Sequence, residues 1–367
     1  MNKLQASFET WQGEGLKTAA ENTLHLLGSS AIGQKIIEHY AFGSEGRVAD
    51  PALHTEVAGI EFENPILFGA GWDKKGRAIH GLYHLGFSGG DVGTVLPFMQ
   101  VGNPKPRLWT VDKDHSVGLN RLGFNSPGMT IVEQNLKEAE PLPIPIGINV
   151  GRNKEISNND AAWAHEQVIR TLGKYASYIV LGISSPNSKD VRKLQDKEYL
   201  RELIQRGYAA MEYPVPLFIK IDGERSFWQL DDMIRIAVEE ALSGMIAINT
   251  YSQSDLKEAY GKRWAKETGG LSGNDPRYRD LATATVRHIY EAAGDKLAII
   301  GVGGVNDTNS ALEKIKAGAS AVQVVTAIRE TRGKVAANIN RRLLEYMQRE
   351  GVGNIQELVG IDTARAA

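Results

Sequence analysis

Eight short apolar segments alternate with eight amphipathic segments along most of the 367-residue chain, and this alternation predicts a (β/α)8 barrel. The alternating region spans about 300 residues, a typical size for this fold. Polar residues and glycines directly follow many of the apolar segments, as expected where parallel strands present a ligand site at their C-terminal ends. An open, doubly wound parallel sheet is the alternative, because a count of strands does not establish closure.

The predicted strands are short apolar runs, and the predicted helices have apolar residues at helical spacing. The strands are expected at 66–70, 89–95, 146–149, 178–183, 217–221, 245–249, 297–301 and 321–325. The helices are expected at 76–86, 127–138, 160–174, 196–211, 228–242, 277–293, 306–317 and 332–349. We therefore expect the barrel over residues 53–350, with a C-terminal tail at 351–367.

Residues 1–52 are expected to form an extension that contains two short helices. Apolar residues recur at helical spacing from Leu16 to Leu27, and Gly28 ends this pattern. A second amphipathic pattern runs from Ile32 to Tyr40. The two helices can dock on their own barrel, contact a membrane surface or contact a second copy of the chain. Docking on the own domain is the most common role of an amphipathic helix.

Composition excludes several classes of function. Basic and acidic residues nearly balance, 42 against 44, which gives no electrostatic reason to expect nucleic acid as a partner. Cysteine is absent, which excludes disulfides, Cys-ligated zinc and a cysteine nucleophile. His80 and His84 have a spacing that can bind metal, but no third ligand is apparent and no metal site is predicted.

The expected localisation is cytoplasmic. No apolar run reaches the roughly 20 residues that a membrane-spanning helix needs. Peripheral contact with the inner face of a membrane, through residues 16–42, stays open as an alternative.

Several polar residues at the predicted strand ends indicate an anionic ligand. Lys220 interrupts an apolar strand, and a buried lysine is costly unless it meets a negative partner. Gly303, Gly304 and Thr326 follow the last two strands, where many barrels bind phosphate through backbone N–H groups. Carboxamides also gather at the strand ends, and they suit a planar, imide-rich ring such as a flavin or a pyrimidine.

A series of motifs, taken in order, resembles the dihydroorotate dehydrogenases, specifically their serine-type, quinone-linked class. The resemblance covers about residues 19–330. Its motifs are Asn64-Pro65, Gly71-Trp72-Asp73-Lys74, Gly102-Asn103-Pro104-Lys105-Pro106-Arg107, Asn120-Arg121-Leu122-Gly123-Phe124-Asn125, Asn149-Val150-Gly151-Arg152-Asn153-Lys154, Ser184-Ser185-Pro186-Asn187, Thr268-Gly269-Gly270-Leu271-Ser272-Gly273 and Ile300-Gly301-Val302-Gly303-Gly304.

The resemblance implies FMN-dependent oxidation of dihydroorotate to orotate in pyrimidine biosynthesis, with a quinone or another molecule as electron acceptor. Ser185 would be the base, with Ser188 or water relaying its proton, and Lys220 would stabilise negative charge on the reduced flavin. The implied FMN-binding residues are Ala70, Gly71, Lys74, Thr94, Asn149, Lys220, Gly273, Gly303, Gly304 and Thr326. The implied substrate-binding residues are Lys74, Asn120, Gly123, Phe124, Asn187, Asn249 and Thr250.

Four positions depart from the family pattern. Gly182 stands where the family has an asparagine that contacts flavin and substrate, so the chain either loses an amide contact or gains room for a bulkier ligand or a water. Ile248 and Val325 replace a usual threonine and tyrosine, and Thr110 lies in a segment that lacks the arginine of the quinone-linked class. Two alternatives therefore stay open: an FMN oxidoreductase acting on another dihydropyrimidine-like substrate, and a flavin-binding barrel without redox turnover.

Overall fold

The eight predicted strands form a closed parallel barrel in the computed structural model, which describes residues 14–112, 114, 116–188 and 190–363. Neighbouring strands follow the order β10-β12-β13-β3-β4-β7-β8-β9 around the barrel. The open-sheet alternative is therefore wrong. The strands are β3 (Ile66–Phe68), β4 (Gly89–Val95), β7 (Ile146–Val150), β8 (Tyr178–Gly182), β9 (Leu217–Ile221), β10 (Gly244–Ala247), β12 (Ala298–Val302) and β13 (Ala321–Val324).

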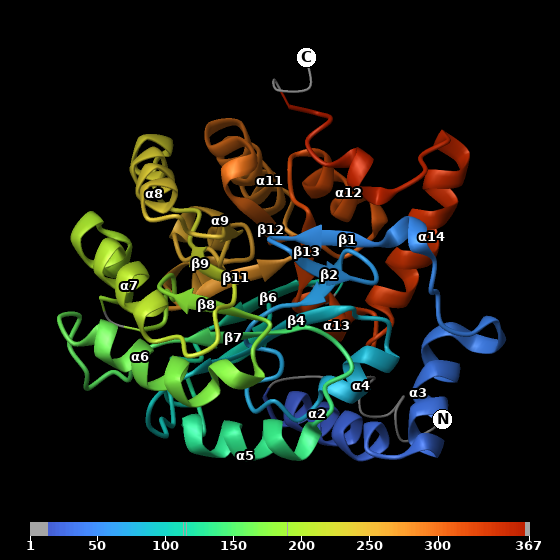
Figure 1. Ribbon diagram of the computed structural model, residues 1–367, viewed down its shortest axis with the longest axis horizontal. Helices are drawn as coiled ribbons and strands as arrows, with labels where there is room; N and C mark the ends of the chain where they lie inside the picture. Colours follow the sequence, from blue (N-terminus) through green and yellow to red (C-terminus); the bar gives the residue numbers. More distant parts are fainter. Residues whose placement is uncertain (1–13, 113, 115, 189, 364–367) are drawn as a thin grey trace.

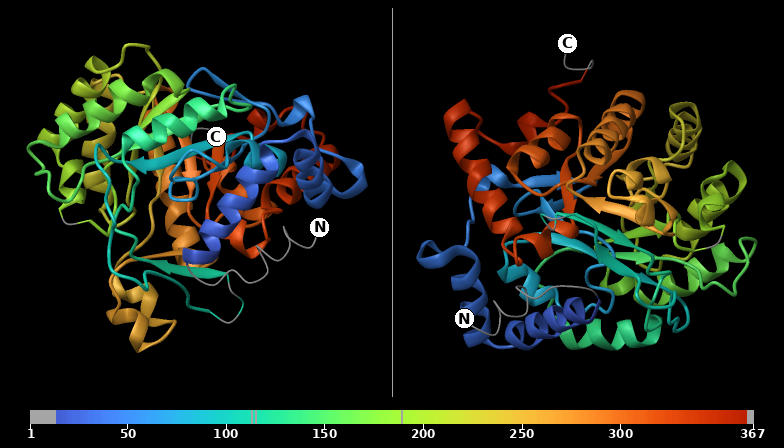
Figure 2. Two further views of the ribbon diagram at one scale, coloured as in Figure 1. Left: turned by 90° about the horizontal axis from the view of Figure 1, so that it is seen from below. Right: turned by 180° about the vertical axis from the view of Figure 1, so that it is seen from behind.

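Helices surround the barrel, as Figures 1 and 2 show. Eight of them lie at the predicted places, and each buries one apolar face against the strands. They are α4 (Ile79–His84), α5 (Met129–Ala139), α6 (Ala161–Leu172), α7 (Lys197–Ala209), α8 (Phe227–Glu239), α11 (Pro276–Ala293), α12 (Thr308–Lys316) and α14 (Val335–Glu350). A further short helix, α13 (Thr326–Glu330), follows β13 directly and was not predicted.

A β-hairpin covers the end of the barrel where the strands begin, which we call the closed end. It consists of β1 (Thr55–Val57) and β2 (Ile60–Phe62), and the Thr55 hydroxyl donates to the Ser320 carbonyl at 2.8 Å. Val57 and Phe62 are buried in one apolar cluster with side chains from the barrel interior, including Phe218. The hairpin therefore covers the apolar interior at this end of the barrel.

A small antiparallel sheet stands at the opposite end of the barrel, which we call the open end. It pairs β5 (Leu108–Thr110), β6 (Val117–Asn120) and β11 (Gly270–Gly273) in the order β11-β6-β5. Two short helices, α9 (Ser254–Glu258) and α10 (Lys262–Lys266), lead into β11, and Trp264 packs against Trp109 with ring centroids 5.9 Å apart. This sheet was not predicted. It brings Asn120 of β6 and Gly273 of β11 to the barrel mouth.

The N-terminal helices α2 (Glu14–Gly28) and α3 (Ala31–Phe42) pack against the protein's own barrel, beside α4. Ala20, Leu24 and Ile37 are fully buried there. Residues 1–13 of the extension and 364–367 of the tail lie outside the described residues. The tail residue Ile355 is buried in the main core. Within the described part of the chain, no helix is long and apolar enough to cross a membrane.

Candidate active site

A large pocket opens at the C-terminal ends of the barrel strands, with an empty volume of about 1430 Å³ that includes open solvent at its mouth. All of the residues that the sequence singled out for catalysis, cofactor or substrate line it. They are Ala70, Gly71, Lys74, Thr94, Asn120, Gly123, Phe124, Asn149, Ser185, Asn187, Lys220, Asn249, Thr250, Gly273, Gly303, Gly304 and Thr326.

Lys220 lies on the floor of the pocket and points into the barrel from β9. Its Nζ donates to the Gln323 Oε1 of β13 at 3.0 Å. Burial lowers the pKa of Lys220, while the charge of nearby Asp91 opposes this shift. The Gln323 side chain also contacts the buried Asp91 carboxylate and the Tyr178 hydroxyl. The floor thus offers the Lys220 cation to a ligand above it.

One wall of the pocket is a glycine-rich loop after β12. Gly303 and Gly304 have φ of 113° and 75°, a region that side chains rarely adopt, and added Cβ atoms would lie 3.0 Å from Tyr278 and 2.6 Å from Arg279. The neighbouring Thr326 begins α13 and donates from its hydroxyl to the Ser272 hydroxyl at 3.0 Å. This wall has the features with which barrels bind phosphate: glycines after the seventh strand and a short helix after the eighth.

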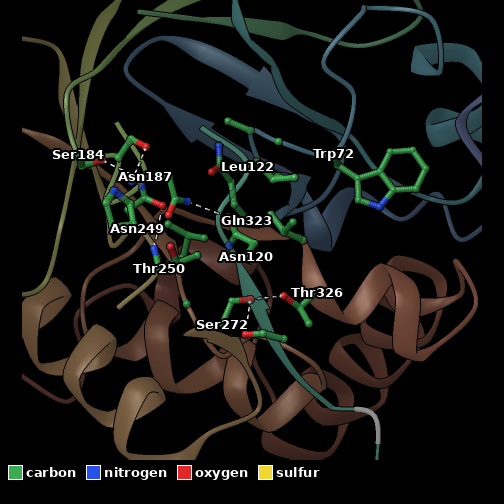
Figure 3. Close-up of a pocket in the computed structure, with 18 of the residues that line it drawn as sticks. Trp72, Asn120, Leu122, Ser184, Asn187, Asn249, Thr250, Ser272, Gln323 and Thr326 are labelled. Carbon is green, nitrogen blue, oxygen red and sulfur yellow. Dashed lines mark hydrogen bonds between the residues drawn. The ribbon is translucent and has the colours of Figure 1, made fainter. Parts of the chain in front are cut away.

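Three asparagines, Asn120, Asn187 and Asn249, line the pocket, and Figure 3 shows them apart from Trp72. The Asn187 Nδ2 donates to the Asn120 Oδ1 at 3.0 Å, and the Asn249 Nδ2 donates to the Ser184 hydroxyl at 3.0 Å. The Asn187 Oδ1 is buried, and no described residue bonds to it. These amides come from a loop after β8, the end of β6 and a loop after β10. Only the folded chain brings them together.

Ser185 lies between two pockets. Its side chain lines the main pocket and also a second, shallower pocket on the outer face of the 184–188 loop. The residue is 6% exposed, and its Oγ accepts from the Asn187 backbone N–H at 3.2 Å. Ser188 lines the second pocket too, and its buried hydroxyl has no partner among the described residues. Ser185 and Ser188 therefore both border this second pocket.

Lys74 is held in place by the loop that follows β3. The carboxylate of Asp73 accepts backbone N–H bonds from Gly76 and Ala78, at 2.9 and 2.8 Å, and this fixes the loop. The Lys74 ammonium donates to the Asn125 side-chain oxygen. Burial lowers the pKa of Lys74 to about 7, so an anionic ligand that pairs with it has a strong effect on its charge.

The neighbours of Gly182 leave little room for a side chain at this position. A Cβ at this position would lie 2.7 Å from the Asn149 Oδ1 and 2.7 Å from the Val150 carbonyl oxygen. The Asn149 Oδ1 is fixed here because it accepts from the Thr94 hydroxyl at 2.7 Å. The space that a side chain would take is thus partly filled by the carboxamide of Asn149. Ile248 and Val325 line the pocket, whereas Thr110 does not.

Sequence reasoning missed several lining residues, among them Lys17, Gln323, Ser272, Tyr278 and Arg329. Gln323 is polar within an apolar strand, the same signal that identified Lys220, and could have been found. Lys17 comes from helix α2, and no local pattern links it to the barrel. His80 and His84 contact the Ala139 carbonyl and Glu38, and no metal-binding group of three His, Cys, Asp or Glu occurs among the residues that the structure describes.

Comparison with known proteins gives one consistent family. The family model for dihydroorotate dehydrogenase matches residues 52–347. A dihydroorotate dehydrogenase (quinone) of Thermus thermophilus is 38% identical over 314 residues, covering 85% of this chain and 88% of that protein. The mitochondrial dihydroorotate dehydrogenase (quinone) of Mus musculus is 37% identical over 327 residues, covering 85% and 80%.

A solved structure agrees with the sequence comparisons. The crystal structure of DHODH from Eimeria tenella in complex with ferulenol superposes with a TM-score of 0.80 at 31% identity. It covers 89% of this chain and 94% of the Eimeria chain. Matches in sequence and in fold extend over nearly the whole chain, and the chain therefore belongs to the dihydroorotate dehydrogenase family.

Proposed function

We propose that this protein oxidises dihydroorotate to orotate in pyrimidine biosynthesis, with FMN as its cofactor and a quinone as electron acceptor. The observation that carries the proposal is the arrangement of one pocket. Ser185, Lys74 and three asparagines surround a space above Lys220, with a glycine-rich wall beside it. The family relatives named dihydroorotate dehydrogenase (quinone) support the same reaction.

The residues of the pocket fit FMN. The Lys220 ammonium lines the pocket and would stabilise an electron-rich ring of the cofactor. Gly303 and Gly304, followed by Thr326, would hold the phosphate because glycine lets the backbone approach closely. When bound, FMN supplies a two-electron acceptor for hydride. Lys220 would stabilise the negative charge that this transfer creates.

The remaining residues would bind and deprotonate the substrate. The Lys74 ammonium would pair with the substrate carboxylate, and the amides of Asn120, Asn187 and Asn249 would bond the imide groups of its ring. Ser185 would take a proton from one ring carbon while the adjacent carbon loses hydride. A serine hydroxyl is a weak base, so this proton must pass on, through water in the second pocket or through Ser188.

The acceptor would approach from the side of the pocket under α2. Lys17 of α2 lines the pocket together with the apolar side chains of Trp72, Leu108 and Val325. Peripheral membrane contact through residues 16–42 is part of the proposal. Leu26 and Ile32 support it, since they are 71% and 77% exposed on the α2–α3 pair.

The test is direct. The purified protein should be yellow, and anaerobic dihydroorotate should bleach its flavin absorbance. Colour without bleaching would contradict the assigned substrate and favour another dihydropyrimidine-like substrate or a barrel without turnover. A colourless protein that cannot be loaded with FMN would overturn the proposal. Ubiquinone, menaquinone, fumarate, NAD and oxygen, compared as acceptors of the reduced flavin, would test the quinone assignment.

Ser185→Ala tests whether Ser185 acts as the base without disturbing FMN binding. We expect flavin reduction to slow about 10²–10⁴-fold, the usual contribution of a positioned base, with FMN still bound. Stopped-flow bleaching measures the rate, and flavin content per protein measures binding. Ser29→Ala, on the exposed turn between α2 and α3, is the matched control and should reduce normally. An unchanged reduction rate in Ser185→Ala would remove Ser185 as the base.

A further inference from the structure

A chain of polar contacts joins helix α2 to Lys74. The Asn125 side chain accepts from the Lys74 ammonium, and its Nδ2 donates to the Glu14 Oε1 at 3.3 Å. Glu14 lies in the first turn of α2, whereas Lys74 follows the first barrel strand. Asn125 therefore joins the N-terminal extension to Lys74 of the pocket.

Glu14 is itself fixed by a double ion pair. The Arg107 Nε donates to the Glu14 Oε2 at 2.7 Å, and its Nη2 donates to the Oε1. Arg107 is only 5% exposed, and its Nη1 donates to the carbonyls of Val101 and Asn103 at 2.6 and 2.8 Å. The Arg107 guanidinium holds the pKa of Glu14 below its usual range, so Glu14 is ionised at neutral pH. A bidentate pair of this kind fixes orientation as well as charge.

The charges around Lys74 come mostly from the same helix. Lys17 and Glu21 of α2 pair with each other, and the Lys17 ammonium also donates to the Trp72 carbonyl. Burial lowers the pKa of Lys74, and the charges of Lys17 and Arg107 lower it further. The carboxylates of Glu21 and Glu14 act in the opposite direction and favour the ammonium form. The two glutamates that favour a charged Lys74 therefore both belong to α2.

We propose that helix α2 is a working part of the substrate site, in which Glu14 acts through Asn125 as a positioning residue for the Lys74 ammonium. The ligand is the carboxylate of the substrate or product. This inference rests on the proposed function, because it assigns Lys74 to that carboxylate. It gives the N-terminal extension a role in substrate binding, in addition to any contact with an acceptor or a membrane.

The role differs from simple packing in its dependence on pH. Orotate binding to the empty site requires a charged Lys74, so affinity should be full below a pH of about 7 and should fall as the pH rises through that value. Loss of the Glu14 charge removes a group that favours the ammonium, so the fall should begin at lower pH. A helix that only fills space would leave the position of this fall unchanged.

The experiment is an orotate titration of the FMN-loaded protein, followed by flavin absorbance, between about pH 6 and 9, which brackets the pKa of Lys74. Glu14→Gln removes the charge and keeps the shape. We expect its fall in affinity to begin about one pH unit lower, which raises the orotate Kd about tenfold at alkaline pH. Glu45→Gln is the matched control. Glu45 lies in the same extension and forms a surface ion pair with Arg341 of α14. Loss of this pair should leave orotate binding as in wild type.

Asn125→Leu keeps the Glu14–Arg107 pair and removes the two bonds through which Asn125 joins Glu14 to Lys74, so it tests the inference even if Glu14→Gln fails to fold. It should raise KM for dihydroorotate about tenfold and leave the saturated rate of flavin reduction within about twofold, because the carboxylate does not change during the reaction. Wild-type pH dependence in Glu14→Gln, or unchanged KM in Asn125→Leu, overturns the inference alone. Wild-type protein that does not bind orotate overturns the proposed function as well.

Discussion

The closed and open ends of the barrel are built from the same strands but have opposite chemistry. Strand β9 shows the change most clearly, since Phe218 and Lys220 are two residues apart and so point to the same side of the strand. Phe218 lies in the apolar cluster under the hairpin, and Lys220 lies on the floor of the pocket. Two neighbouring positions on the same face of β9 thus have different roles: Phe218 stabilises the fold, and Lys220 lines the pocket.

A buried polar layer marks the boundary between the two ends. The Tyr178 hydroxyl donates to the Asp91 Oδ1 at 2.8 Å, while the Tyr178 ring packs edge-on against Phe218 with centroids 5.6 Å apart. Burial raises the pKa of Asp91, and the nearby Lys220 charge opposes that shift. Because this layer lies between the two ends, we expect that each end can be changed without loss of the other.

Phe218→Ala should give the largest effect on stability and test this separation. Removal of a fully buried phenylalanine typically costs about 3–5 kcal/mol of unfolding free energy. Urea denaturation measures the loss, and flavin content per folded molecule should stay near that of wild type. Phe227→Ala, on the exposed start of α8, is the control and should cost little. Loss of FMN from folded Phe218→Ala protein would show that the two ends are coupled.

The sequence predicted the barrel well because its strands are buried on both faces. Such strands appear as continuous apolar runs, for example Leu217–Ile221, where only Lys220 breaks the pattern. The small sheet at the open end lacks this signal. Its strands β5, β6 and β11 are three or four residues long, and β11 pairs with a strand about 150 residues earlier in the chain. Pairing over such a distance leaves no local pattern in the sequence.

The residues of the candidate site also fall into two groups, those that the sequence could predict and those that it could not. Residues at strand ends, such as Thr94, Asn149 and Lys220, follow from the fold alone because parallel strands present their C-terminal ends together. The positions of Lys17 and Glu14 could not be predicted in this way, because their contacts depend on where α2 docks on the barrel. The resemblance to a family supplied the roles of individual residues, such as Ser185, and the structure adds the contacts between them.

Gly182→Asn should have an intermediate effect, confined to the open end. Its Cβ would meet the Asn149 Oδ1 and the Val150 carbonyl at 2.7 Å, and overpacking of this kind typically costs about 1–3 kcal/mol. We expect weaker FMN binding, because the Asn149 carboxamide must move away from Thr94. Flavin fluorescence measures the Kd.

The matched control for this substitution is Gly173→Ala, at a glycine whose Cβ would have no neighbour within 4 Å. It should leave FMN affinity unchanged. The opposite outcome for Gly182→Asn, tighter orotate binding at unchanged FMN affinity, would mean that the strands adjust and that the chain has only lost an amide contact.

Thr326→Val should give the smallest effect, confined to the pocket wall. The substitution keeps the shape and removes the hydroxyl that donates to Ser272, a bond that joins α13 to β11 across the barrel mouth. One such bond is worth about 0.5–1.5 kcal/mol, so FMN affinity should fall about two- to tenfold, with little change in unfolding free energy. Thr171→Val, whose hydroxyl bonds within α6 far from the pocket, is the control. If both variants bind FMN equally well, the bond between Thr326 and Ser272 does not contribute to FMN binding, and the wall is held by the glycine loop and α13.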